Sequence, residues 1–123
     1  MTNGGTGDRR LLGGHAPSVV VFTGGSPPLG SLLEALSEAG VRFRILGRRE
    51  QVLEARPRVV VVDLHGYADP WNDVRVFGVD PRLEGTRVYL FAEATGRLSE
   101  TERRESRRRF ARSVAQALHS LER

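Results

Sequence analysis

The chain has 123 residues, 39% of them hydrophobic and 28% charged, with a net charge of +4. This length suits one domain with a single core, and the composition is that of a globular rather than a disordered chain. The absence of cysteine excludes disulfides and thiolate metal sites, and no apolar run reaches the roughly 20 residues of a membrane span. All 19 basic residues are arginine. We therefore expect a cytoplasmic protein without a membrane segment.

The first 16 residues are rich in glycine and show no periodicity, which predicts a flexible tail. His15 is the one group of chemical interest in this tail, and we expect no function for it. Residues 17–123 then form a single domain, because no linker or internal repeat interrupts them.

The domain opens with the apolar run Val19–Phe22, which is short enough for a strand. The turn formers that follow are typical of a connection from a strand to a helix. Ser26 suits the N-cap and Pro27 the first helical position. Leucines then recur at helical spacing, and Gly40 stands where a glycine ends a helix.

Val41, Phe43 and Ile45 alternate with arginines, which predicts a second strand at the edge of the sheet with one solvated face. A short helix over residues 48–55 follows, with Val52 and Leu53 directed inward. The proline at position 57 blocks its extension.

Four consecutive valines followed by Asp63 lie at the centre of the chain, within the run Arg58–Leu64. Such a run is typical of a parallel strand that is buried on both faces. Asp63 would stand at the carboxyl end of this strand, where open α/β sheets bind their ligands. It is therefore the first candidate for a functional residue.

Trp71, Val74 and Phe77 are spaced three apart and predict a third helix, although the valines around them are mediocre helix formers. Turn signals then lead to a fourth strand over Arg87–Ala92.

The last segment predicts one long helix, with Ser99 as N-cap and Glu102 completing a capping box. Its apolar stripe consists of Phe110, Val114, Leu118 and Leu121. Its first half, residues 100–109, is nearly all charge and offers no face to bury. Pairs four residues apart would neutralise part of this charge, and they are Glu100 with Arg104 and Glu105 with Arg109.

Strands that alternate with helices predict a parallel sheet with right-handed crossovers. We predict a flavodoxin-like fold, a three-layer α/β/α arrangement with four parallel strands in the order 2-1-3-4. Right-handed crossovers place the first and last helices on the same face of the sheet. The fourth strand would lie at the sheet edge unless residues 94–98 or a partner covers it. An apolar edge of this kind is a site for an added strand or for a two-fold dimer.

Four features of the chain occur together and in order: an apolar first strand, a leucine-striped helix that ends in Ala39-Gly40, the string Ala55-Arg56-Pro57-Arg58 with the valines, Asp63 and Leu64 after it, and Asp80-Pro81-Arg82-Leu83 before the fourth strand. Through these features the chain resembles, over residues 19–93, the receiver domain of bacterial response regulators. It implies that Asp63 occupies the phosphoacceptor position.

Four features of a working receiver are missing, however. Thr23 and Gly24 stand where an acidic pair would hold Mg²⁺, and Ala92 replaces the hydroxyl residue that relays the signal. The chain contains no lysine to contact the phosphoryl group, and no fifth strand is recognisable after the fourth. A single aspartate would hold Mg²⁺ too weakly to neutralise a transferring phosphoryl group. The resemblance therefore implies a degenerate pseudo-receiver without metal, cofactor or catalysis.

The expected crevice at the carboxyl ends of the strands is lined by Thr23, Gly24, Gly25, His65 and Ala92. The glycine turn that opens the first helix offers backbone N–H groups to an anion. It matches neither the Walker A pattern nor GxGxxG, which favours a plain turn. Asp63, His65 and Asp69 are candidate metal ligands or an acid/base pair, although solvated loop residues are the more common arrangement.

Arg103, Arg104, Arg107 and Arg108 form a candidate interaction surface on the last helix. We expect a non-catalytic signalling or scaffolding module that binds another protein, with a homodimer through the fourth strand or the last helix as one form. The alternatives are a nucleic-acid-binding protein that uses the arginine-rich helix, and a phosphorylatable receiver that uses Asp63. The salt dependence of binding distinguishes a phosphate interface from an apolar one.

Overall fold

The computed structural model describes residues 18–93 and 97–121, so the predicted flexible tail lies outside the described residues. Four parallel strands form one sheet in the order β2-β1-β3-β4, which confirms the predicted strand order and the flavodoxin-like α/β fold. The elements in chain order are β1 (Val19–Phe22), α1 (Gly30–Glu38), β2 (Arg44–Leu46), α2 (Arg49–Ala55), β3 (Val59–Asp63), α3 (Trp71–Val79), the 3-10 turn η2 (Pro81–Leu83), β4 (Arg87–Phe91) and α4 (Glu100–Leu121).

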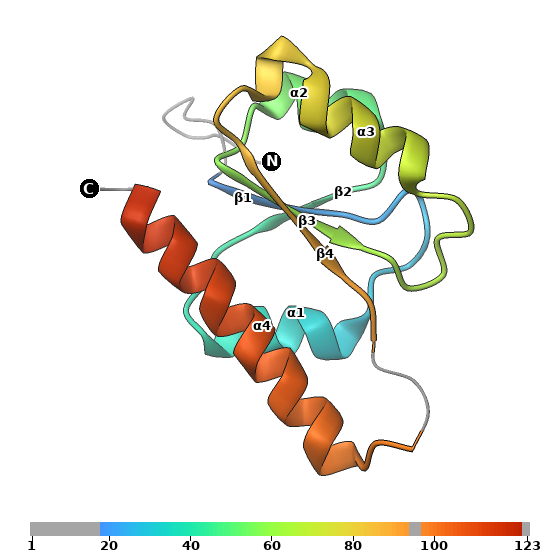
Figure 1. Ribbon diagram of the computed structural model, residues 1–123, viewed down its shortest axis with the longest axis vertical. Coiled ribbons are helices and arrows are strands. Elements are labelled where there is room, and N and C mark those ends of the chain that lie inside the picture. The colour runs from blue at the N-terminus through green and yellow to red at the C-terminus, as the bar shows by residue number, and fades with distance from the viewer. Residues whose placement is uncertain (1–17, 94–96, 122–123) are drawn as a thin grey trace, which may run out of the picture.

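The helices form two layers around the sheet. Figure 1 shows α2 and α3 over one face and α1 and α4 over the other. From β1 the chain crosses to β2 at one edge of the sheet, and from β2 it then crosses back to β3 and on to β4 at the other edge. Right-handed crossovers therefore place α1 on one face and the next two helices on the opposite face. The prediction that the first and last helices share a face is confirmed.

Strand β3 is the centre of the core, as predicted. Val59, Val60, Val61 and Val62 are each 0% exposed, because β1 and β4 flank the strand and helices cover both faces. Val59 and Val61 pack in the layer with α1 and α4, whereas Val60 and Val62 pack with α2 and α3. Burying a valine side chain contributes about 1.5–3 kcal/mol, so this strand is a large part of the stability.

Helix α1 begins later than the sequence predicts. Its first residue is Gly30 and its N-cap is Leu29, so the expectation that Ser26 caps the helix and that Pro27 opens it is wrong. The reason is the proline pair, because a residue that precedes proline is driven out of the helical region. Pro27 precedes Pro28, and Leu29 after them is still extended, so the helix begins only at Gly30.

The end of α1 is as predicted. Gly40 has a φ of +82°, which a side chain would strain. Its N–H donates to the carbonyl of Ser37 at 3.0 Å, and the N–H of Val41 donates to the carbonyl of Leu36 at 3.0 Å. These two bonds form a Schellman motif, which satisfies the last carbonyls of the helix.

Strand β2 is shorter than its alternating pattern predicts. Arg44–Leu46 alone pairs with β1. Val41 is buried before the strand begins, whereas Ile45 is 44% exposed and Leu46 is buried in its place. The expected inward set is therefore wrong at Ile45. The strand lies at the sheet edge, where the helices leave this side chain uncovered.

Helix α4 follows β4, and the described residues after β4 contain no fifth strand. The predicted capping box is confirmed: the N–H of Ser99 donates to Oε1 of Glu102 at 2.8 Å, and the N–H of Glu102 donates to Oγ of Ser99 at 3.1 Å. In the described ranges 18–93 and 97–121, no helix combines the length and the apolar character that crossing a membrane requires.

Candidate functional site

Asp63 lies at the carboxyl end of β3, as predicted, but its side chain is fully buried at 0% exposure. Oδ2 accepts a hydrogen bond from the backbone N–H of Leu29 at 2.8 Å, and Oδ1 accepts one from the backbone N–H of His65 at 2.9 Å. Neither donor belongs to the glycine turn at Thr23–Gly25. The donors come instead from the N-cap residue of α1 and from the loop that follows β3.

The turn after β1 is held by its own hydrogen bonds. The Thr23 side chain is buried, and its Oγ1 accepts from the N–H of Gly25 at 3.3 Å. The hydroxyl of Ser26 donates to the carbonyl of Gly66 at 2.8 Å, which ties this turn to the loop after β3. The two loops at the carboxyl edge therefore support one another.

Tyr67 fills the space beside this turn. Gly24 has a φ of +65°, and a Cβ atom built on it would lie 2.2 Å from the Tyr67 ring. The same ring packs on Phe22 with the ring centroids 5.9 Å apart. The tyrosine thus lies against the glycine turn that the sequence offers as an anion cradle, which favours the plain turn.

The Tyr67 hydroxyl donates to Oδ2 of Asp73 at the start of α3. The other carboxylate oxygen, Oδ1, accepts from the Arg49 guanidinium of α2 at 3.1 Å. Burial, together with the hydrogen bond to the Asp73 carboxylate, raises the pKa of Tyr67 to about 12. The side chain is therefore a neutral phenol at physiological pH, which suits a structural link rather than a proton acceptor.

Sequence reasoning missed this chain of contacts. Tyr67 lies in a loop without periodicity. Arg49 and Asp73 lie on two different helices and are 24 residues apart in the sequence. The signal that the sequence offers is Tyr67 itself, a large aromatic residue within a stretch of turn-forming residues. Such a residue needs an apolar surface for its ring and a partner for its hydroxyl.

The other predicted crevice residues do not form a reactive group. His65 and Asp69 are exposed, and Ala92 is exposed just beyond the end of β4. Within residues 18–93 and 97–121 no three histidine, aspartate or glutamate side chains are placed to hold a metal ion. Asp63, His65 and Asp69 are therefore not brought together as a ligand set.

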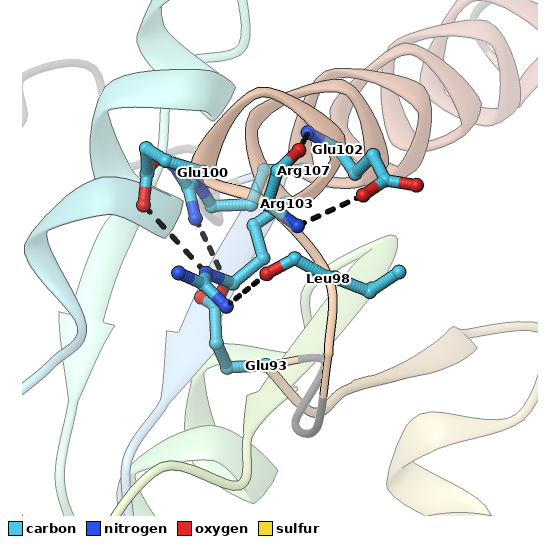
Figure 2. A network of polar contacts seen from close by, with 7 residues as sticks. Glu93, Leu98, Glu100, Glu102, Arg103 and Arg107 are labelled. Atoms are coloured by element: carbon cyan, nitrogen blue, oxygen red, sulfur yellow. Dashed lines mark hydrogen bonds and ion pairs between the residues drawn. The ribbon is translucent and has the colours of Figure 1, made fainter.

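Arg107 is the main correction to the predicted interaction surface, because it is only 8% exposed. It donates to Glu93 at 2.8 Å and to Glu100 at 2.8 Å, as Figure 2 shows. In the same view Arg103 donates to the carbonyl of Leu98 at 2.8 Å. Arg107 thus joins the segment after β4 to α4, and the first half of the helix does bury one side chain.

The predicted pairs on α4 are also wrong. Glu100 pairs with Arg107 and, at 3.6 Å, with Arg103, whereas Glu105 pairs with Arg112 at 3.2 Å. Two of these three pairs lie seven residues apart, two helical turns along one face. Arg104 and Arg108 remain exposed and form no ion pair within the described part of the chain. They are what remains of the predicted surface.

At the carboxyl edge of the sheet, the Asp63 carboxylate is directed inward and takes part in hydrogen bonds of the fold. Each oxygen of the Asp63 carboxylate accepts one backbone N–H group, and the residue is 0% exposed, so neither oxygen faces solvent. The neighbouring tyrosine keeps its proton.

Comparisons of the chain with models of known families, with curated protein sequences and with solved structures each return no match. The resemblance to receiver domains therefore rests on the residues quoted above, and it stays a prediction.

Proposed function

We propose that this chain is a non-catalytic signalling or scaffolding module of pseudo-receiver type, which binds other proteins and does not transfer phosphoryl groups. The observation that carries the proposal is the state of Asp63, which is fully buried with both oxygens bonded to backbone N–H groups. To accept a phosphoryl group, this buried carboxylate would have to become accessible and give up the N–H of Leu29 at Oδ2 or that of His65 at Oδ1.

The chemistry around Asp63 supports the same proposal. A receiver neutralises the transferring phosphoryl group with a metal and a lysine, and this chain has Thr23 and Gly24 at the metal position and no lysine. The Thr23 hydroxyl already accepts the N–H of Gly25, and Gly24 packs against Tyr67. The composition without cysteine agrees with a reducing compartment, and the resemblance to receiver domains implies a bacterial source. The proposal therefore places the module in the bacterial cytoplasm.

The test exposes the protein to acetyl phosphate with Mg²⁺, and separately to beryllium fluoride with Mg²⁺. Intact mass reports phosphorylation, and the fluorescence of Trp71 reports a change at the start of α3, where its side chain is 59% exposed. We expect neither a mass adduct nor a saturable fluorescence change. An adduct that disappears in Asp63→Asn and persists in Asp69→Asn would overturn the proposal.

Nucleic-acid binding through α4 is the second candidate, since Arg104 and Arg108 are exposed and unpaired within the described residues. Phosphate contacts would make the affinity for DNA or RNA fall steeply with salt. Binding of a random duplex that weakens in the double variant Arg104→Gln and Arg108→Gln, and that falls with salt, would favour this candidate. The predicted surface offers a small footprint, because carboxylates engage two of its four arginines, Arg103 and Arg107.

A further inference from the structure

Within residues 18–93 and 97–121, no backbone group pairs with the outer side of β4. The N–H of Arg87 donates to the carbonyl of Arg58 at 2.9 Å, and the carbonyl of Phe91 accepts from Leu64 at 3.0 Å, so these residues direct their polar groups toward β3. Backbone groups alternate in direction along a strand, and Val88 and Leu90 therefore direct theirs outward. Figure 1 shows β4 nearest the viewer, and no described helix passes in front of it.

The two edges of the sheet differ in their protection. Edge strand β2 has three residues and carries Arg44, and short, charged edges resist further pairing. Strand β4 has five residues, with Val88 half-buried and Leu90 40% exposed at its outward-bonding positions. The β4 edge is thus the longer and more apolar of the two.

We propose that a second copy of this chain pairs with β4 as an antiparallel strand, with the two-fold axis at Tyr89. In this register Val88 lies opposite Leu90 of the second copy, and the symmetry repeats the pair. Residues that exchange both bonds in an antiparallel ladder are the outward-directed ones, so all four of their N–H groups find a carbonyl. The inference deepens the proposed function, on which it rests, by naming the protein partner.

Charge complementarity favours a second copy over an unrelated peptide. Arg87 is exposed and forms no ion pair with any residue that the structure describes. In the proposed register it lies opposite Phe91 of the second copy and diagonal to Glu93, within reach of a long side chain. The Glu93 side chain is 23% exposed and pairs with Arg107 through Oε1, whereas its Oε2 is buried and has no hydrogen-bond partner in the described part of the chain. The two-fold axis supplies this contact twice.

The interface is small, so the dimer should be weak. A pairing over five residues with few flanking contacts belongs at the low end of specific interfaces, below about 1,200 Å². We therefore expect self-association in the micromolar range and a monomer on dilution.

The first experiment is sedimentation velocity on the full chain, from about 10 μM to about 500 μM, a range that brackets micromolar affinities. We expect the wild type to shift toward a dimer, and Leu90→Lys to weaken association at least tenfold. Ile45→Lys is the matched control, because Ile45 is 44% exposed on the other edge and the charge change is the same. Circular dichroism checks that both variants fold.

The second experiment tests the register, and the lack of cysteine in the chain makes it clean. Residues opposite one another without hydrogen bonds have Cα atoms about 4.5 Å apart, which a disulfide tolerates. Tyr89→Cys should therefore form a covalent dimer on mild oxidation, whereas Ile45→Cys should not. Equal cross-linking of the two variants would overturn the register.

A wild type that stays monomeric across the whole concentration range would overturn the dimer and leave the proposed function standing. A dimer that Leu90→Lys and Ile45→Lys weaken equally would overturn the pairing through β4 and also leave the proposed function standing. A monomer that instead loses binding of another protein in Leu90→Lys would assign the β4 edge to that protein. Phosphorylation of Asp63, by contrast, would overturn the proposed function whatever the oligomeric state.

Discussion

The Asp63 carboxylate accepts the backbone N–H of Leu29 at 2.8 Å, 34 residues earlier in the chain. Leu29 is the N-cap residue of α1, and it has no side-chain oxygen with which to cap the helix itself. A buried anion from the central strand thus lies at the positive end of the helix and holds its start against the sheet. Asp63 stands at the end of a central strand, where α/β proteins often bind ligands, but here its carboxylate caps a helix.

Asp63→Asn is expected to destabilise the protein by about 1–3 kcal/mol, the cost of an unsatisfied buried polar group. The amide keeps one acceptor oxygen, and its NH₂ group then faces either the N–H of Leu29 or that of His65. Urea unfolding followed by circular dichroism measures the change. Asp69→Asn is the control, because Asp69 is exposed in the same loop and should change stability by less than about 0.5 kcal/mol. Equal stability of the two variants would contradict the capping role.

Gly24→Ala should cost more than Gly25→Ala, although both glycines have positive φ values of +65° and +91°. The backbone strain is about 1–2 kcal/mol at each position. At Gly24 the new Cβ also meets the Tyr67 ring, which adds about 1–3 kcal/mol, whereas it meets nothing within 4 Å at Gly25. Thermal unfolding compares the two variants. In a Tyr67→Ala background the difference should shrink, and an unchanged difference would refute the contact.

The titration of Tyr67 gives a prediction about alkaline stability. Its pKa is raised from 10.0 to about 12, so the folded state favours the protonated phenol. The corresponding stability is fully present below pH 10 and is lost as the pH rises from about 10 through about 12. Ultraviolet absorbance should show a tyrosine titrating near 12 that is absent from Tyr67→Phe. The variant should also lose less stability than the wild type over this range. A wild type that loses its stability in parallel with Tyr67→Phe would contradict the link to Asp73.

Arg107→Ala is expected to cost about 3 kcal/mol, because it leaves Glu93 largely buried without its cation. The matched change is Arg112→Ala, which breaks the exposed pair with Glu105 on the same helix and should cost about 0–1 kcal/mol. Hydrogen exchange at the start of α4 should rise in Arg107→Ala alone. Similar losses in both variants would mean that Arg107 is an ordinary surface arginine.

The local pattern of the chain determined most of the fold. Four valines in a row are typical of a strand covered on both faces, and the alternation of strands with helices is typical of a parallel sheet with right-handed crossovers. Local signals were also sufficient for the Schellman ending at Gly40 and for the capping box of Ser99 with Glu102. Each depends on residues at most five positions apart, and the sequence displays such spacings directly.

The tertiary structure decided what the polar residues do. Asp63 has the same sequence context whether its oxygens face solvent or Leu29, and only the packing of α1 on the sheet determines which. Arg107 looks like its neighbours on the helix, yet the segment after β4 places Glu93 beside it and so buries it. Contacts between residues far apart in the chain depend on the relative placement of whole elements. No periodicity records that placement, so the site was the part that sequence reasoning placed least well.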